Sequence, residues 1–180
     1  MSEQTIAPRA ALPARGKRPL GQRLGFALGG LVLIFAFTFA WLYLAGRVLH
    51  LHTFYASFVF AWYWGIVDKA EFSRLPWSIL GCLLGLAVVW QLSFLSAHYG
   101  TAGAVVAVLV IAAVLFMQIM HWGARVINPG TMLFLAVFTA TPIMGVVNFM
   151  DAGATTVAGA LYMAAVIYML KRVTGIGGAA

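Results

Sequence analysis

Two apolar stretches hold the side chains best suited to binding a small solute. Residues 51–67 are dense in Phe, Tyr and Trp, and residues 130–149 place threonines and a proline near the middle of an apolar run. Pro142 cannot donate a backbone hydrogen bond, so it frees the carbonyl of Phe138 for other partners. The candidate residues for lining a solute pathway are Trp62, Trp64, Thr139, Thr141, Pro142 and Asn148. The structural alternative is an ordinary kinked helix whose aromatic neighbours face lipid.

The ionisable residues avoid the centres of the apolar stretches. Asp68, Glu71 and Asp151 all fall at the ends of such stretches. A carboxylate inside the membrane is usually a proton or ion relay, so its absence argues against a proton-coupled pump. Serines without acid or base partners nearby in sequence give no nucleophile pattern, and we therefore predict no enzyme.

The histidines are candidate ligands for zinc or haem. His50, His52 and His98 would share one membrane face, and His121 would lie at the other. His50 and His52 are two residues apart and point to different sides of a helix. We predict no metal or cofactor. A three-histidine site is the alternative, and interfacial histidines with a weak pH response are the ordinary interpretation.

The distribution of charge defines the elements that carry these residues. Of 180 residues, 63% are hydrophobic and 8% are charged, against about 25% charged in a soluble domain. Charge is missing from residues 24–46, 48–67, 75–124, 126–150 and 152–170. About 20 apolar residues of helix cross a bilayer core, so the longest run holds two helices. Its reversal is expected near residues 98–101, its most polar point.

We therefore predict an all-α integral membrane protein with six transmembrane helices. Their expected bounds are 23–46, 51–67, 76–97, 101–122, 130–149 and 153–170. This membrane domain, 23–172, would follow a disordered basic cytoplasmic tail over 1–22 and precede a flexible tail over 173–180. The single cysteine, Cys82, excludes an intrachain disulfide.

Basic residues orient the predicted bundle. Ten of the 11 Lys and Arg fall on the N-terminal side of the six-helix arrangement, and only Arg47 falls on the other. The positive-inside rule then places both termini in the cytoplasm, with the chain in the bacterial inner (plasma) membrane. The net charge of +7 is accordingly a topology signal and indicates no nucleic-acid partner.

The second and third predicted helices are similar to the fifth and sixth. Residues 54–68 align with 134–148, and residues 79–92 align with 157–170. Copies three helices apart cross the membrane in opposite directions, so the similarity predicts an inverted 3+3 repeat, as in many transporters. Chance similarity between apolar helices is the alternative, because the first and fourth helices do not align.

Glycines predict where helices approach closely. Gly25 and Gly29 are four residues apart, and so are Gly81 and Gly85. Small residues at this spacing let helix backbones meet. The contact would lie within one chain or between protomers.

The segment Ile127-Asn128-Pro129-Gly130-Thr131, followed by Met-Leu-Phe-Leu-Ala over 132–136, resembles a known pattern. It is similar to the Pro-Gly-x-Phe start of the penultimate apolar segment in a family of small bacterial inner-membrane proteins, classed as a domain of unknown function. Weaker similarity covers residues 51–64, 78–81 and Trp90. A vaguer likeness links the layout to the membrane halves of aromatic-acid and fusaric-acid exporters. Neither resemblance implies a catalytic residue.

Together these features predict a polytopic membrane protein that passes a small, neutral or weakly amphipathic solute. The pathway of this channel or facilitator would run between the second and fifth helices. The alternative is a non-transporting subunit or assembly factor of a larger membrane complex. The lipid bilayer is the expected partner in both cases, with a homo-oligomer or a larger membrane complex as the further assembly.

Overall fold

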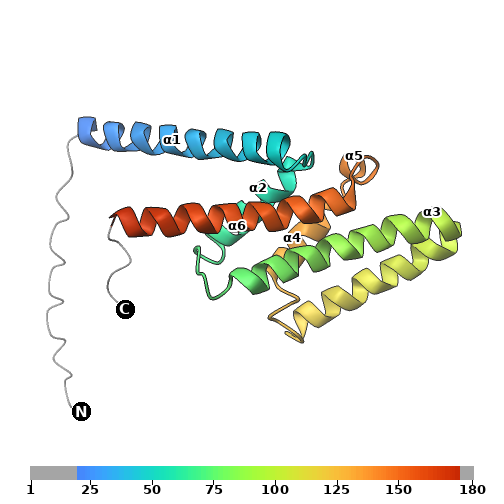
Figure 1. Cartoon of the computed structure of the whole chain (residues 1–180). Coiled ribbons are helices and arrows are strands. Elements are labelled where there is room, and N and C mark those ends of the chain that lie inside the picture. Colours follow the sequence, from blue (N-terminus) through green and yellow to red (C-terminus); the bar gives the residue numbers. More distant parts are fainter. Residues whose placement is uncertain (1–19, 175–180) are drawn as a thin grey trace, which may run out of the picture. The chain divides into compact units, whose positions relative to one another are not determined.

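The computed structural model describes residues 20–174, without the side chains of 20–23, 26, 141, 142 and 174. Every regular element in this range is a helix (Figure 1). The elements are α1 (Leu20–Tyr43), the π-helix η1 (Leu44–Val48), α2 (Phe54–Ile66), α3 (Leu75–Ile119), α4 (Pro129–Phe138), α5 (Thr141–Met144) and α6 (Phe149–Thr174). The tails predicted over 1–22 and 173–180 lie almost wholly outside the described residues.

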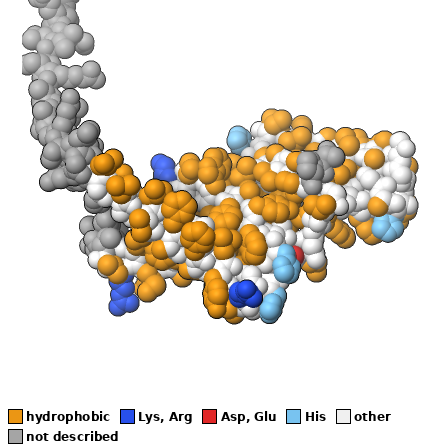
Figure 2. Space-filling view, turned by 90° about the horizontal axis from the view of Figure 1, so that it is seen from above, with side chains coloured by type: hydrophobic (Ala, Val, Ile, Leu, Met, Phe, Trp, Pro, Cys, Tyr) orange, Lys and Arg blue, Asp and Glu red, His pale blue; other side chains and the backbone are white. Residues whose placement is uncertain are grey.

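Three stretches are long and apolar enough to cross a membrane. They are Ala27–Val48, Leu75–Ile119 and Phe149–Val173. Large hydrophobic side chains are exposed along them, and Figure 2 shows such side chains covering most of the visible face of the described part. Exposed apolar surface on this scale is stable in lipid and not in water. These findings support the predicted all-α membrane protein.

The predicted reversal within the longest apolar run is confirmed. Gly100 has φ 57° and ψ −136°, outside the helical region, and α3 turns back on itself there (Figure 1). Glycine adopts this backbone conformation without the strain that a side chain would cause. The two halves then pack closely, since a Cβ at Gly103 would lie 2.0 Å from the carbonyl oxygen of Leu95. They are roughly 37 and 28 Å long at 1.5 Å per residue.

The single helix predicted over 130–149 is wrong. Helix α4 ends at Phe138, Ala140 is extended with ψ 125°, and α5 begins at Thr141. Proline disfavours helical conformation in the residue before it and suits the first turn of a new helix. Pro142 therefore separates two short helices where a kink in one helix was expected.

The helix predicted over 51–67 is shorter than expected, with 13 residues in α2. Helix α4 has ten residues. These lengths correspond to roughly 20 and 15 Å, against about 30 Å for a bilayer core. Neither helix can cross a membrane alone, so the six-helix arrangement is not present as six full-length helices.

The described residues form two compact units, one up to Ala36 and one from Phe37. In the first unit the glycines at 25 and 29 have open space, since an added Cβ would meet nothing within 4 Å. In the second unit α4 packs mainly against α3, and α2 mainly against α6. The core of this unit is largely aromatic around α2 and α4.

The predicted repeat is not shown by these elements. In the aligned register, the continuous helix α2 would match the end of α4, the break after it and α5. The packing is nevertheless reciprocal, because each short helix lies against the long helix of the other half. The inverted repeat stays a prediction.

Gly85 offers a direct test of the α3–α4 contact. A Cβ there would lie 2.4 Å from the Thr131 carbonyl oxygen and 2.9 Å from the Phe134 Cβ, whereas one at Gly65 would meet nothing within 4 Å. We expect Gly85→Ala to lower the free energy of unfolding by about 1–3 kcal/mol. The matched control Gly65→Ala should leave it unchanged. Thermal unfolding in detergent measures both, and equal midpoints would contradict the contact.

Candidate functional site

Helices α2 and α4 lie side by side and antiparallel. The ring of Tyr55, at the start of α2, is 5.4 Å from the ring of Phe138, at the end of α4. At the other end Tyr63 lies against Gly130, where an added Cβ would be 2.8 Å from the tyrosine ring. The first residues of each short helix therefore lie beside the last residues of the other.

The junction between the two short helices is apolar. The rings of Phe134 and Phe138 in α4 are fully buried and stack at 5.3 Å. Phe60 and Trp64 of α2 are also fully buried and stack at 6.4 Å. Between the helices lies an apolar pocket of about 360 Å³, lined by Phe58, Val59, Trp62, Leu133 and Val137.

One end of the junction is held by Asp151 of α6. Its carboxylate accepts hydrogen bonds from the backbone N–H groups of His52 and Thr53, at 3.0 and 2.6 Å, and from the Thr53 hydroxyl. These donors precede α2, whose first N–H groups have no partner within the helix. A negative charge is also favourable at a helix N-terminus. We call this arrangement the Asp151 clasp.

The other end of the junction opens into a polar cavity of about 250 Å³. We call it the polar cavity, and its lining residues are Tyr63, Asp68, Arg74, Trp77, Ser78, Ala124, Arg125, Asn128 and Pro129. They come from the end of α2, the first turn of α3, the start of α4, and the connections that precede α3 and α4. Charged groups, aromatic rings and amide groups thus meet where three helix ends converge.

Asn128 fastens one wall of the polar cavity. Its side-chain oxygen accepts from the N–H groups of Gly130 and Thr131, at 2.9 and 3.3 Å, and caps α4. The Thr131 hydroxyl in turn accepts from the Asn128 N–H at 3.2 Å. The Asn128 amide donates to the carbonyl of Trp77 in α3, at 2.8 Å. Gly81 leaves room for this amide, because a Cβ there would lie 2.2 Å from it.

Asp68 supplies the negative charge of the polar cavity. It is 8% exposed, and its carboxylate accepts a hydrogen bond from the Ser78 hydroxyl at 2.5 Å. The Tyr63 hydroxyl and the Cys82 thiol lie close enough to interact electrostatically with this carboxylate. The nearest cation is Arg74, with 3.7 Å between its Nη1 and the carboxylate. Arg74 binds Glu71 more closely, at 2.7 Å.

A second arginine borders the polar cavity. The guanidinium of Arg125 lies over the ring of Trp77, 5.8 Å from its centre, as in a cation–π contact. It makes no salt bridge with any residue in the described part of the chain. The arginine is exposed at the mouth of the cavity.

The predicted pathway residues are not brought together. Trp62 is 55% exposed, while Trp64 is buried and donates its indole N–H to the Glu71 carbonyl at 3.1 Å. Thr139 follows the far end of α4, and its hydroxyl donates to the Leu135 carbonyl at 2.7 Å. Asn148 accepts from the first N–H groups of α6. Thr141 and Pro142 begin α5, and their side chains lie outside the described residues.

The polar cavity was missed because its residues are far apart in sequence. Asp68, Ser78 and Asn128 each stand at the edge of an apolar run, where a cap or a loop residue is the ordinary interpretation. The one sequence signal that pointed to this region was Asn128-Pro129-Gly130, which is a strong helix start inside a nearly charge-free segment. Capping explains that residue order, and its contact with α3 could not be read from it.

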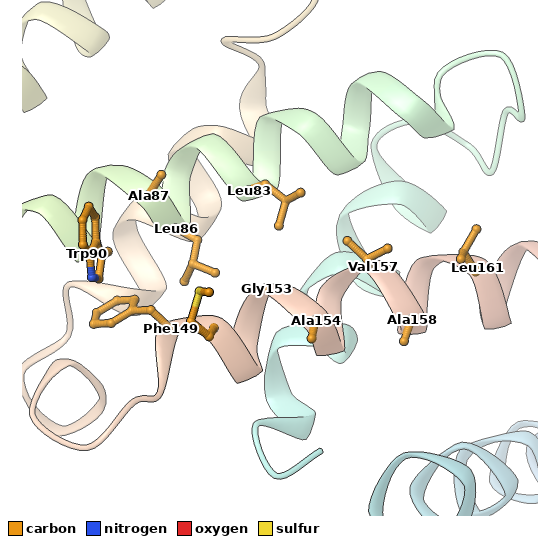
Figure 3. Close-up of a pocket in the computed structure, with 11 residues that line it drawn as sticks. Leu83, Leu86, Ala87, Trp90, Phe149, Gly153, Ala154, Val157, Ala158 and Leu161 are labelled. Carbon is orange, nitrogen blue, oxygen red and sulfur yellow. The ribbon is translucent and has the colours of Figure 1, made fainter. Parts of the chain in front are cut away.

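An apolar groove of about 810 Å³ lies between α3 and α6. Figure 3 shows Leu83 and Leu86 projecting from α3 toward α6, with Trp90 beside Phe149 at one end. The α6 side carries Gly153, whose lack of a side chain widens the groove. Within residues 20–174, no three His, Cys, Asp or Glu side chains gather in a way that could hold a metal ion.

Comparison of the chain with protein-family models, with curated proteins and with solved structures gives no match. The function is accordingly inferred from the geometry alone.

We expect Asn128→Ala to destabilise the protein more than Asn148→Ala. Both remove an N-cap, but Asn128 is buried and also ties α4 to α3, while Asn148 is exposed and water can replace it. The expected losses are about 2 kcal/mol at Asn128 and about 0.5 kcal/mol at Asn148. Thermal unfolding of the purified variants gives the comparison. Equal losses would show that the tie to Trp77 contributes nothing.

Proposed function

We propose that the protein is a facilitator for a small polar solute in the bacterial inner membrane, with its pathway between α2 and α4. The observation that carries the proposal is the pair of short antiparallel helices with polar groups at both ends. Because α2 is only roughly 20 Å long, the polar cavity and the Asp151 clasp cannot both lie at the surfaces of a 30 Å core. At least one of them lies at membrane depth.

Interrupted helices at membrane depth have a functional association. Irregular backbone is tolerated there only where protein buries it or where it lines a water-filled space. In many transporters the substrate site is built from such discontinuous helices. The break between α4 and α5, and the short α2, supply this kind of element on both sides of the junction.

The described conformation is the closed one under this proposal. The polar cavity reaches Tyr63 and Pro129, and beyond them the side chains between α2 and α4 are aromatic or aliphatic. Passage requires α2 and α4 to separate, which also strains the Asp151 clasp at the far end. No carboxylate lies between these two ends, so the proposal includes no coupling to protons and the solute moves down its own gradient.

A non-transporting membrane subunit is the second candidate. The observation that favours it is the large apolar groove between α3 and α6, which a helix of a larger complex would fill. Purification in mild detergent distinguishes the two functions. A stoichiometric membrane partner that is lost on Gly153→Leu favours the subunit, whereas a preparation without a partner that carries flux in vesicles favours the facilitator.

Phe138→Leu tests the pathway. The smaller side chain loosens the closed junction, so we expect faster solute entry into vesicles that contain this variant than into wild-type vesicles. Phe116→Leu is the matched control, because Phe116 is 54% exposed, belongs to α3 and lies outside the buried aromatic core. Stopped-flow light scattering with glycerol, urea and small amino acids measures entry. Equal rates for empty vesicles, wild type and both variants would reject the facilitator.

A further inference from the structure

The charges around the polar cavity do not cancel in pairs. The closest ion pair joins the Nε of Arg74 to the carboxylate of Glu71 at 2.7 Å, and this pair is internally neutral. Two further charged residues border the cavity outside this pair. The carboxylate of Asp68 has Arg74 as its nearest cation, at 3.7 Å, and Arg125 has no acidic partner among the described residues. The cavity is thus bordered by a carboxylate that shares Arg74 with Glu71, at the longer distance, and by a guanidinium that has no ion pair among the described residues.

Both charges retain hydrogen-bonding capacity. A carboxylate has about four acceptor positions, and the hydroxyls of Ser78 and Tyr63 occupy two of those on Asp68. A guanidinium has five N–H donors, and Arg125 rests on the Trp77 ring without a salt bridge to a described residue. Asp68 lies almost buried, and Arg125 lies exposed, so acceptors are deep in the cavity and donors are near its mouth.

We propose that the polar cavity binds a small zwitterion of the amino-acid class. The ammonium group of the solute donates to Asp68, and its carboxylate accepts from Arg125. Charge-assisted hydrogen bonds of both kinds are stronger than neutral ones. The volume of about 250 Å³ limits the solute to a small side chain.

Solutes with one net charge are disfavoured by the same two residues. A simple cation gains the contact with Asp68 but meets Arg125, and a simple anion gains the contact with Arg125 but meets Asp68. Like charges placed in this way reject the wrong ligand. The inference rests on the proposed function for its transport role, but binding can be tested alone.

The first experiment compares L-alanine with its two charged halves, ethylammonium and propionate, on the purified wild-type chain in detergent. Isothermal titration calorimetry should detect alanine binding and at least about tenfold weaker binding of each half, the loss expected for one charge-assisted contact. Equal affinities for the three compounds, or no heat from alanine at tens of millimolar, would overturn the inference.

Variants locate the site. Arg125→Gln should weaken alanine binding about tenfold, and Arg172→Gln, an exposed arginine away from the cavity, should not. Asp68→Asn should act like Arg125→Gln. If that variant does not fold, Arg125→Glu replaces it as the second test, because two negative charges should reverse the preference and favour ethylammonium over alanine. Alanine affinity unchanged by Arg125→Gln, or no reversal with Arg125→Glu, would overturn the site.

The binding experiment and the flux experiment test the two proposals independently of each other. Alanine binding that depends on Arg125, without flux of any solute into vesicles, keeps the zwitterion site and rejects the facilitator. Flux of glycerol or urea without alanine binding keeps the facilitator and rejects the zwitterion.

Discussion

The structure depends on satisfying the backbone groups at the ends of two short helices inside a largely apolar chain. An unpaired N–H or carbonyl group at membrane depth costs several kcal/mol, since lipid offers no partner. The first N–H groups of α4 are capped by Asn128, and those before α2 are bound by Asp151. Without these two side chains, the backbone N–H groups of Gly130, Thr131, His52 and Thr53 would lose these partners.

The same constraint explains why polar chemistry gathers at two points. Polar groups are grouped at the helix ends, where backbone donors need them, and the junction between the ends is left to aromatic rings. Close packing follows from small residues: Gly81 and Gly85 let α4 approach α3, and Gly159 lets α2 approach α6, since a Cβ there would lie 2.3 Å from Ser57. The polar cavity exists because three helix ends converge on one side of this tight contact.

Local features of the sequence were sufficient for part of the fold. Long apolar runs with few charges identified the three stretches that can cross a membrane, but the same rule wrongly assigned full spans to 51–67 and 130–149. The reversal at Gly100 followed from a polar, turn-prone point inside a run too long for one span. Pro142 was expected to disturb its helix by a kink, whereas in the structure the helix ends before it and a new helix begins. The residue before proline resists helical conformation, and only the packing of α4 against α3 decided that the chain would break there.

By itself, the sequence determined the class of protein, the helical content and most helix boundaries, because these follow from hydrophobicity and backbone preference within short segments. Only the tertiary structure decided which residues form a site. Asp68, from the α2–α3 connection, reaches the same cavity as Arg125 and Asn128, from the α3–α4 connection. Trp64 is buried while Trp62 is exposed, although the two are neighbours in sequence. Such outcomes depend on which helix faces which, and that choice is made by long-range packing and by the pairing of most buried polar groups.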